Sequence, residues 1–136
     1  MKQLMPLLLL GLMTTGFAQN DAAPFGKINI YYFHTSYRCT NCKHFDSWTQ
    51  DVVEKRLKSL ADTLSYQTIN IEEEENKHFV DDYNLVTKSV ILSTVDENGE
   101  ELEWKNLDKI WIEVRDENKF KDYIESEIKS MLESVQ

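Results

Sequence analysis

The chain of 136 residues is poor in cysteine, proline, glycine and positive charge. It holds two cysteines, two prolines and four glycines, and it contains no internal repeat. A Pro- or Gly-rich linker is therefore excluded, and the sequence suits one compact domain. Lysine and arginine together number 15 against 24 aspartates and glutamates, which gives a formal net charge of -9. A chain this acidic repels nucleic acid and anionic lipid, so neither is expected as a partner.

Long hydrophobic runs are also missing. The apolar stretch 4–13 follows Lys2 and is too short to cross a bilayer, and no second such stretch follows. A charged start, an apolar run and the small-residue sequence Gly16-Phe17-Ala18 are typical of a secretory signal peptide. We expect residues 1–18 to be cleaved, leaving 19–136 as a single exported domain, periplasmic or secreted, without a transmembrane segment. A buried N-terminal helix is the alternative, but the run has no polar face to match it.

The hydrophobic pattern predicts strands and helices in alternation. Strands are expected at 28–33, 64–71, 89–95 and 101–104, the last two joined by a turn at 96–99 that contains Asn-Gly. Helices are expected over 42–61, around 79–83, over 107–114 and after Asp116, which caps the last one. A strand, a crossover helix and a strand imply a parallel pair, and the later hairpin adds antiparallel strands. We therefore expect an α/β fold with a central mixed four-stranded sheet and helices on both faces.

Both cysteines lie in one short segment, Cys39-Thr40-Asn41-Cys42, between the first predicted strand and the first predicted helix. The start of a helix presents unpaired N–H groups, and together with the helix dipole they stabilise a thiolate. Arg38, Lys43 and His44 add three potential cations in an otherwise acidic chain, and His34 stands at the strand exit. We expect these four side chains to tune the thiols, with His34 alternatively an ordinary loop residue.

Three kinds of site are open for this pair. In a redox pair, Cys39 is the exposed nucleophile, and Cys42, nearer the apolar stripe of the helix, resolves the mixed disulfide. A thiophilic metal or metalloid site would use the same two sulfurs with His34 or His44, although zinc normally takes two ligand pairs and there is no second CxxC motif. A purely structural disulfide would stabilise the fold by only ~2 kcal/mol, because its ring is so small. We expect a redox pair that needs no cofactor beyond the reversible disulfide.

Two further patterns have ordinary explanations. The acidic run 72–75 lacks the glycine-containing ligand loop of a calcium site and is typical of a solvated strand exit followed by a first helical turn. Trp48, Trp104 and Trp111 each fall within an apolar period, which favours packing in the core over lining a pocket.

The strand, the cysteine motif followed by Lys43, and the helix together resemble the thioredoxin-like superfamily. More narrowly, the segment from Tyr32 to Cys42 is similar to the small exported thioredoxin-like proteins of the ArsF type. The resemblance implies a thioredoxin-like fold, attack by Cys39, resolution by Cys42, and thiol–disulfide exchange with an exported or membrane protein. The alternatives are a metal- or metalloid-binding module that uses the same cysteines, and a non-catalytic interaction domain with a structural disulfide.

The chain departs from the thioredoxin pattern at three places. Thr40-Asn41 replaces the Gly-Pro pair that tunes the redox potential, so the direction of electron flow is not assigned. No carboxylate lies in the strand 28–33, where thioredoxin buries an aspartate as proton acceptor. Pro24 is the only proline after residue 18, so the cis-proline that faces the cysteines and aligns partner peptides is missing. Ser89 is expected in its place, facing the substrate.

Overall fold

The computed structural model describes residues 24–136, so the predicted signal peptide lies outside the described residues. One sheet contains four strands: Phe25–His34 (β1), Leu64–Asn70 (β2), Ser89–Asp96 (β3) and Glu101–Asn106 (β4). Their order in the sheet is β2-β1-β3-β4, with β1 and β2 parallel and the other neighbours antiparallel. The predicted mixed four-stranded sheet is confirmed.

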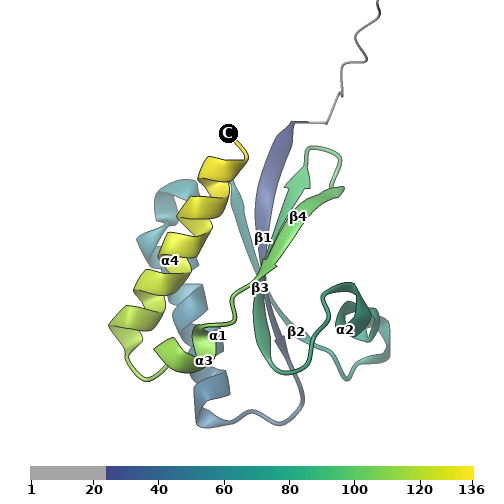
Figure 1. Ribbon diagram of the computed structural model, residues 1–136, viewed down its shortest axis with the longest axis vertical. Coiled ribbons are helices and arrows are strands. Elements are labelled where there is room, and N and C mark those ends of the chain that lie inside the picture. Colours follow the sequence, from purple (N-terminus) through teal and green to yellow (C-terminus); the bar gives the residue numbers. More distant parts are fainter. Residues whose placement is uncertain (1–23) are drawn as a thin grey trace, which may run out of the picture.

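Helices lie on both faces of the sheet, as expected (Figure 1). The α-helices of the described residues are Thr40–Asp51 (α1), His78–Asp82 (α2), Ile110–Glu113 (α3) and Glu117–Ser134 (α4). Figure 1 shows α1, α3 and α4 on one face and the short α2 on the other. Within residues 24–136, no helix is both long and apolar enough to span a bilayer. The crossover helix α1 joins two parallel strands and begins at the cysteine pair, which is the arrangement of a thioredoxin-like α/β fold.

Two hydrophobic clusters occupy the two faces of the sheet. Successive residues of a strand point to opposite faces, and β1 is apolar on both. Ile28, Ile30 and Tyr32 are fully buried in the main cluster, which side chains of α1 and α4 complete. Phe33 enters a smaller cluster with Tyr83, next to α2. Because β1 is covered on both faces as far as Phe33, packing fixes the position of its last residues, from which the chain continues to the cysteines.

The helix predicted over 42–61 changes character in its middle. It is α-helical to Asp51 and then π-helical over Val52–Arg56, where the Leu57 N–H donates to the Val52 carbonyl at 2.9 Å. The apolar residues step by four from Trp48 to Val52 and by five from Val52 to Leu57. A π-turn accommodates the longer step, so Val52 and Leu57 are both buried on the same side.

Later turns and caps agree with the sequence pattern, and one helix is shorter than predicted. Gly99, in the turn between β3 and β4, has a φ of 83°, a conformation that glycine adopts at no steric cost. Asp116 caps α4 by accepting the Lys119 N–H at 3.0 Å. The helix predicted over 107–114 is confined to α3, because the Leu107 N–H still donates to a carbonyl of β3 at 2.9 Å.

Candidate functional site

The two cysteines form a disulfide at the N-terminus of α1. Their sulfurs are 2.19 Å apart and their Cα atoms 5.0 Å apart. Cys39 is the N-cap residue, with an extended backbone, and its sulfur accepts the Cys42 N–H at 3.2 Å. Cys42 is fully buried, whereas Cys39 is partly exposed. The two cysteines of the disulfide therefore differ in exposure, with Cys42 buried in the fold and Cys39 at its partly exposed edge.

The N-cap position gives Cys39 the surroundings of an attacking thiol. The first turn of α1 carries no acidic side chain, so its N–H groups and the positive end of the helix dipole face the sulfur unopposed within that turn. When the disulfide opens, the Cys42 N–H can donate to the Cys39 thiolate, and a hydrogen bond to the charged form favours it. The thiolate is the form that attacks a disulfide.

The loop before the cysteines is attached to the exit of β2. The Ser36 N–H donates to the Glu72 carboxylate at 2.8 Å, and the Asn70 side-chain amide donates to the Ser36 hydroxyl at 3.2 Å. Hydrogen bonding by the side chain and backbone of Ser36 lowers the pKa of Glu72. The acidic run 72–75 thus supplies one carboxylate to this loop, a contact that no sequence pattern indicated.

On its other side the loop is attached to α1 through Arg38. The guanidinium of Arg38 forms an ion pair with Asp46, one helical turn after Cys42, and lies 5.8 Å from the centroid of the Tyr32 ring. The second carboxylate oxygen of Asp46 accepts the hydroxyl of Tyr66, on β2, at 2.6 Å. The hydrogen bond to Asp46 raises the pKa of Arg38, and burial raises the pKa of Tyr66. Arg38, one of the cations predicted to tune the thiols, is therefore paired with the carboxylate of Asp46.

The other residues predicted to tune the thiols lie in different settings. Lys43 is exposed in the first turn of α1. His44 stacks on Trp48 with ring centroids 4.2 Å apart, and its buried Nδ1 has no hydrogen-bond partner. His34 has its Nδ1 2.8 Å from the Thr35 carbonyl oxygen. Across residues 24–136, no three His, Cys, Asp or Glu side chains are grouped to hold a metal ion, so neither histidine joins the two cysteines in such a group.

The segment before β3 reaches the cysteine loop through Lys88. Its carbonyl accepts the indole N–H of Trp111 at 3.2 Å, and its ammonium lies 5.5 Å from the ring centroid of Tyr37. Ser89 is the first residue of β3, is only 3% exposed, and donates its hydroxyl to the Thr87 carbonyl at 2.8 Å. The described residues contain no cis peptide bond.

Exposed apolar side chains occur in the cysteine loop, in the segment before β3 and on α3. Tyr37 is 74% exposed, Val86 96% and Trp111 38%. We refer to these three residues as the apolar rim. Val86 and Trp111 also line a cavity of about 160 Å³ beside the start of β3. The expectation that all three tryptophans lie in the core is therefore not met, since Trp111 belongs to this surface and Trp104, on β4, is 37% exposed.

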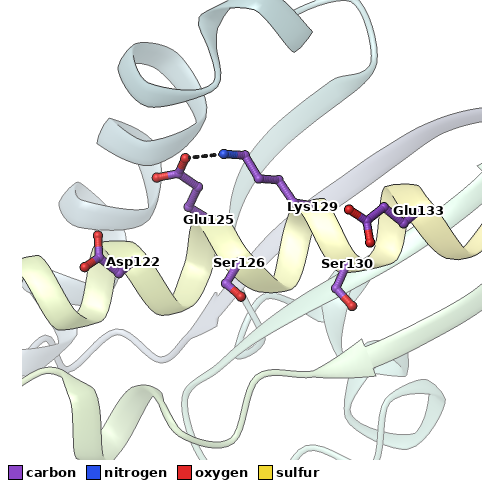
Figure 2. Close-up of a pocket in the computed structure, with 6 residues that line it drawn as sticks. All are labelled: Asp122, Glu125, Ser126, Lys129, Ser130 and Glu133. Carbon is purple, nitrogen blue, oxygen red and sulfur yellow. Dashed lines mark hydrogen bonds and ion pairs between the residues drawn. The ribbon is translucent and has the colours of Figure 1, made fainter.

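A larger cavity, of about 450 Å³, lies on α4 and not at the cysteines. Figure 2 shows the six residues that line it: Asp122, Glu125, Ser126, Lys129, Ser130 and Glu133. All six belong to one helix, and Lys129 is engaged by Glu125 at 2.7 Å. A groove with one wall, no histidine or cysteine beside its serines and no unpaired buried group offers little chemistry, so we place the candidate site at the disulfide.

Neither a protein-family model nor a curated protein matches this chain. Among solved structures it is similar to a thioredoxin from Fasciola hepatica, at 14% identity and a TM-score of 0.40, over 73% of this chain and 79% of that one. It is also similar to the germline-specific thioredoxin Deadhead from Drosophila melanogaster, at 15% identity and a TM-score of 0.40, over 71% and 77% of the two chains. For a thioredoxin from Thermus thermophilus the identity is 15% and the TM-score 0.38, over 66% and 72%.

Similarity at this level carries no argument about function. The thioredoxin-like fold is assigned from the strand order, the parallel pair β1–β2 and the place of the cysteines at the start of α1. The narrower resemblance to ArsF-type proteins stays a prediction.

Proposed function

We propose that this protein is an exported thiol–disulfide oxidoreductase that uses Cys39 and Cys42 as its redox pair. The observation that carries the proposal is a disulfide at the N-cap of α1 in which Cys39 is partly exposed and Cys42 is buried. A helix N-terminus favours the thiolate, which is the reactive species in disulfide exchange. The signal-peptide pattern in residues 1–18 and the ArsF-type resemblance support a location outside the cytoplasm, where disulfides persist.

In the reducing direction, exchange takes two steps. The Cys39 thiolate attacks one sulfur of a partner protein's disulfide, which forms a mixed disulfide and releases the other partner sulfur as a thiolate. Cys42 then loses its proton and attacks the Cys39 sulfur, which closes the intramolecular disulfide and releases the second partner thiolate. Two electrons pass from the dithiol to the partner, and the released thiolates take up protons from solvent. In the oxidising direction the same steps run in reverse, with a partner dithiol as the reductant.

The apolar rim supports a protein as the partner. Contiguous exposed apolar side chains beside a reactive group mark protein interaction surfaces. Trp111 packs edge-on against Phe45 of α1, with ring centroids 4.8 Å apart, and lines one cavity with Val86. Lys88 links the two parts of this surface, since its carbonyl accepts from Trp111 and its ammonium lies over the Tyr37 ring. A partner chain bound there would be held next to Cys39.

A glutathione redox titration of the purified protein, read by mass spectrometry, tests the proposal. We expect a reversible two-electron transition between disulfide and dithiol, and faster alkylation of Cys39 than of Cys42 in the reduced form. Cys42→Ser should accumulate mixed disulfides with partner proteins, whereas Cys39→Ser should not. A disulfide that stays closed across the glutathione range would overturn the proposal. Stoichiometric metal in the reduced protein, lost in Cys39→Ser, would replace it with metal or metalloid binding.

A further inference from the structure

Arg38 and Asp46 flank the cysteine pair in the sequence and form an ion pair with each other in the fold. Arg38 directly precedes the N-cap residue Cys39, and Asp46 follows Cys42 by four residues. Residues four apart on a helix are neighbours, with Cβ atoms about 5–6 Å apart, so Asp46 lies one turn along α1 from the buried sulfur. The ion pair brings the Arg38 guanidinium to this carboxylate, so both charges lie on the helix face next to Cys42. Charges interact appreciably over distances up to a Debye length, about 10 Å at 0.1 M salt.

The Asp46 carboxylate is held at both oxygens. Arg38 donates to one of them, and the hydroxyl of Tyr66 donates to the other at 2.6 Å and to the Asp46 carbonyl at 3.2 Å. The side chains of the ion pair are only 32% and 21% exposed, and the Tyr32 ring lies 5.8 Å from the guanidinium carbon. The loop, α1, β1 and β2 thus all contribute to fixing the pair, so the two charges keep their places relative to the sulfurs.

The two charges act on the dithiol form in opposite directions. Reduction of the disulfide creates a thiolate at Cys39, and a cation nearby stabilises that thiolate while an anion destabilises it. Stabilising the reduced form raises the reduction potential of the couple. Arg38 alone would therefore make the protein more oxidising, and the Asp46 carboxylate opposes this effect.

We propose that Asp46 is a charge-balancing, positioning residue of the redox site, which cancels the Arg38 charge and so keeps the reduction potential of the Cys39–Cys42 pair below the value that Arg38 alone would set. This inference rests on the proposed function, because it requires that the disulfide open and close reversibly. It assigns to Asp46 no contact with the partner and no proton transfer.

Three variants compared in the glutathione titration at neutral pH and low ionic strength test the inference. Asp46→Asn leaves the Arg38 charge unopposed and should shift the equilibrium toward the dithiol by about tenfold, which is ~30 mV for a two-electron couple. Arg38→Met should shift the equilibrium by a similar factor toward the disulfide. The double variant lacks both charges and should return to within about twofold of the wild-type equilibrium.

A matched control comes from the same helix. Asp51 is also on α1 and also ion-paired, with Lys121 at 2.9 Å, but it lies twelve residues from Cys39, about 18 Å along the helix. Asp51→Asn removes the same charge and should leave the potential unchanged. Tyr66→Phe keeps both charges and should move the potential less than Asp46→Asn does, and it serves as a second variant if Asp46→Asn fails to fold.

The possible failures are distinguishable. If both single variants shift the potential in the same direction, or if Asp46→Asn lowers the unfolding temperature while its potential stays at the wild-type value, the pair only supports the loop and the inference is overturned. If the wild-type protein shows no reversible transition, the proposed function itself is overturned, and the inference with it.

Discussion

Two cysteines that are three positions apart in the chain have very different exposure in the fold. Cys39 lies at the N-cap, outside the first turn of α1, whereas Cys42 falls on the stripe that continues through Phe45 and Thr49, both completely buried. The buried face of α1 therefore starts at Cys42 and does not include Cys39. This difference in depth, rather than the motif alone, is the reason for proposing Cys39 as the attacking residue and Cys42 as the resolving one.

The hydrogen bond from Tyr66 to Asp46 gives a prediction about stability at the same scale. Tyr66→Phe removes the hydroxyl but keeps the ring, so a partly buried carboxylate loses one charge-assisted donor. We expect the free energy of unfolding to fall by about 1–3 kcal/mol, measured by urea denaturation. An unchanged urea midpoint and slope would contradict this prediction, because it would mean that water replaces the hydroxyl beside Asp46 at no cost in stability. Tyr37→Phe, at an exposed tyrosine, is the control and should have no effect.

At the scale of helices and strands, the positions of the elements follow from the sequence, while the partners of individual charges do not. Runs of β-branched, aromatic and other apolar residues indicated β1 and β3, alternation indicated β2, and the Asn-Gly turn indicated that β4 returns beside β3. The Asp116 cap indicated the start of α4. Asp46 escaped prediction, although its spacing of four from Cys42 places it on the same helix face. Its contact with Tyr66 depends on the register of β2 against β1, which local pattern does not specify.

The tryptophans show a second limit of the same kind. An apolar period tells which side of an element is apolar, but it does not tell whether another element covers that side. Trp48 packs against Phe120 of α4, whereas Trp111 sits on a single helical turn that nothing covers fully, and it is 38% exposed. The same apolar pattern that correctly predicted the core residues therefore wrongly predicted that Trp111 is buried.

The contact between α1 and α4 includes an ion pair whose contribution depends on pH. Asp51 accepts from Lys55 and from Lys121 of α4, and these hydrogen bonds lower the pKa of the Asp51 carboxyl. A lowered pKa in the folded state means that the contribution is complete above the ordinary value of 3.8 and is lost as the pH falls through the lowered one. Because the carboxylate is 34% exposed and screened by solvent, we expect it to contribute only about 0.5 kcal/mol.

Urea denaturation of the wild type and Asp51→Asn at two pH values checks this prediction. At pH 7 the variant should be less stable by about 0.5 kcal/mol, and the difference should shrink as the pH falls below 3.8 and through the lowered pKa of Asp51. High salt at pH 7 should reduce the difference. If the two proteins still differ in stability by the same amount at low pH, the effect of Asp51→Asn comes from helix packing and not from charge.

At the scale of the whole molecule, the site is assembled at one end of the sheet from segments far apart in sequence. The exits of β1 and β2 contribute the cysteine loop and Glu72, the start of β3 contributes Lys88, and α3 contributes Trp111. The turn between β3 and β4 lies at the opposite end of the sheet, where β1 begins (Figure 1). The fold thus brings the partly exposed Cys39, Tyr37 and Trp111 to one end of the sheet of an acidic molecule.

The role of the apolar rim can be tested with little effect on stability. Val86 is 96% exposed, so Val86→Ser removes almost no buried surface and should leave the free energy of unfolding unchanged. If the rim binds protein partners, the variant should exchange with a protein disulfide several-fold more slowly, while its reaction with oxidised glutathione, which is too small to cover the rim, keeps the wild-type rate. Stopped-flow measurement of both rates checks the prediction.

Leu102 provides the control for this comparison. It is 44% exposed on β4, and its strand pairs with the last residues of β3, at the end of the sheet remote from the cysteines. Leu102→Ser removes a similar apolar group from the same molecule and should change neither rate. Equal slowing by the two substitutions would point to a general change of the surface, and equal slowing of both substrates by Val86→Ser would place its effect at the sulfurs. Only a loss specific to Val86 and to the protein substrate fits a partner bound on the rim, because only that partner is large enough to contact the rim and Cys39 together.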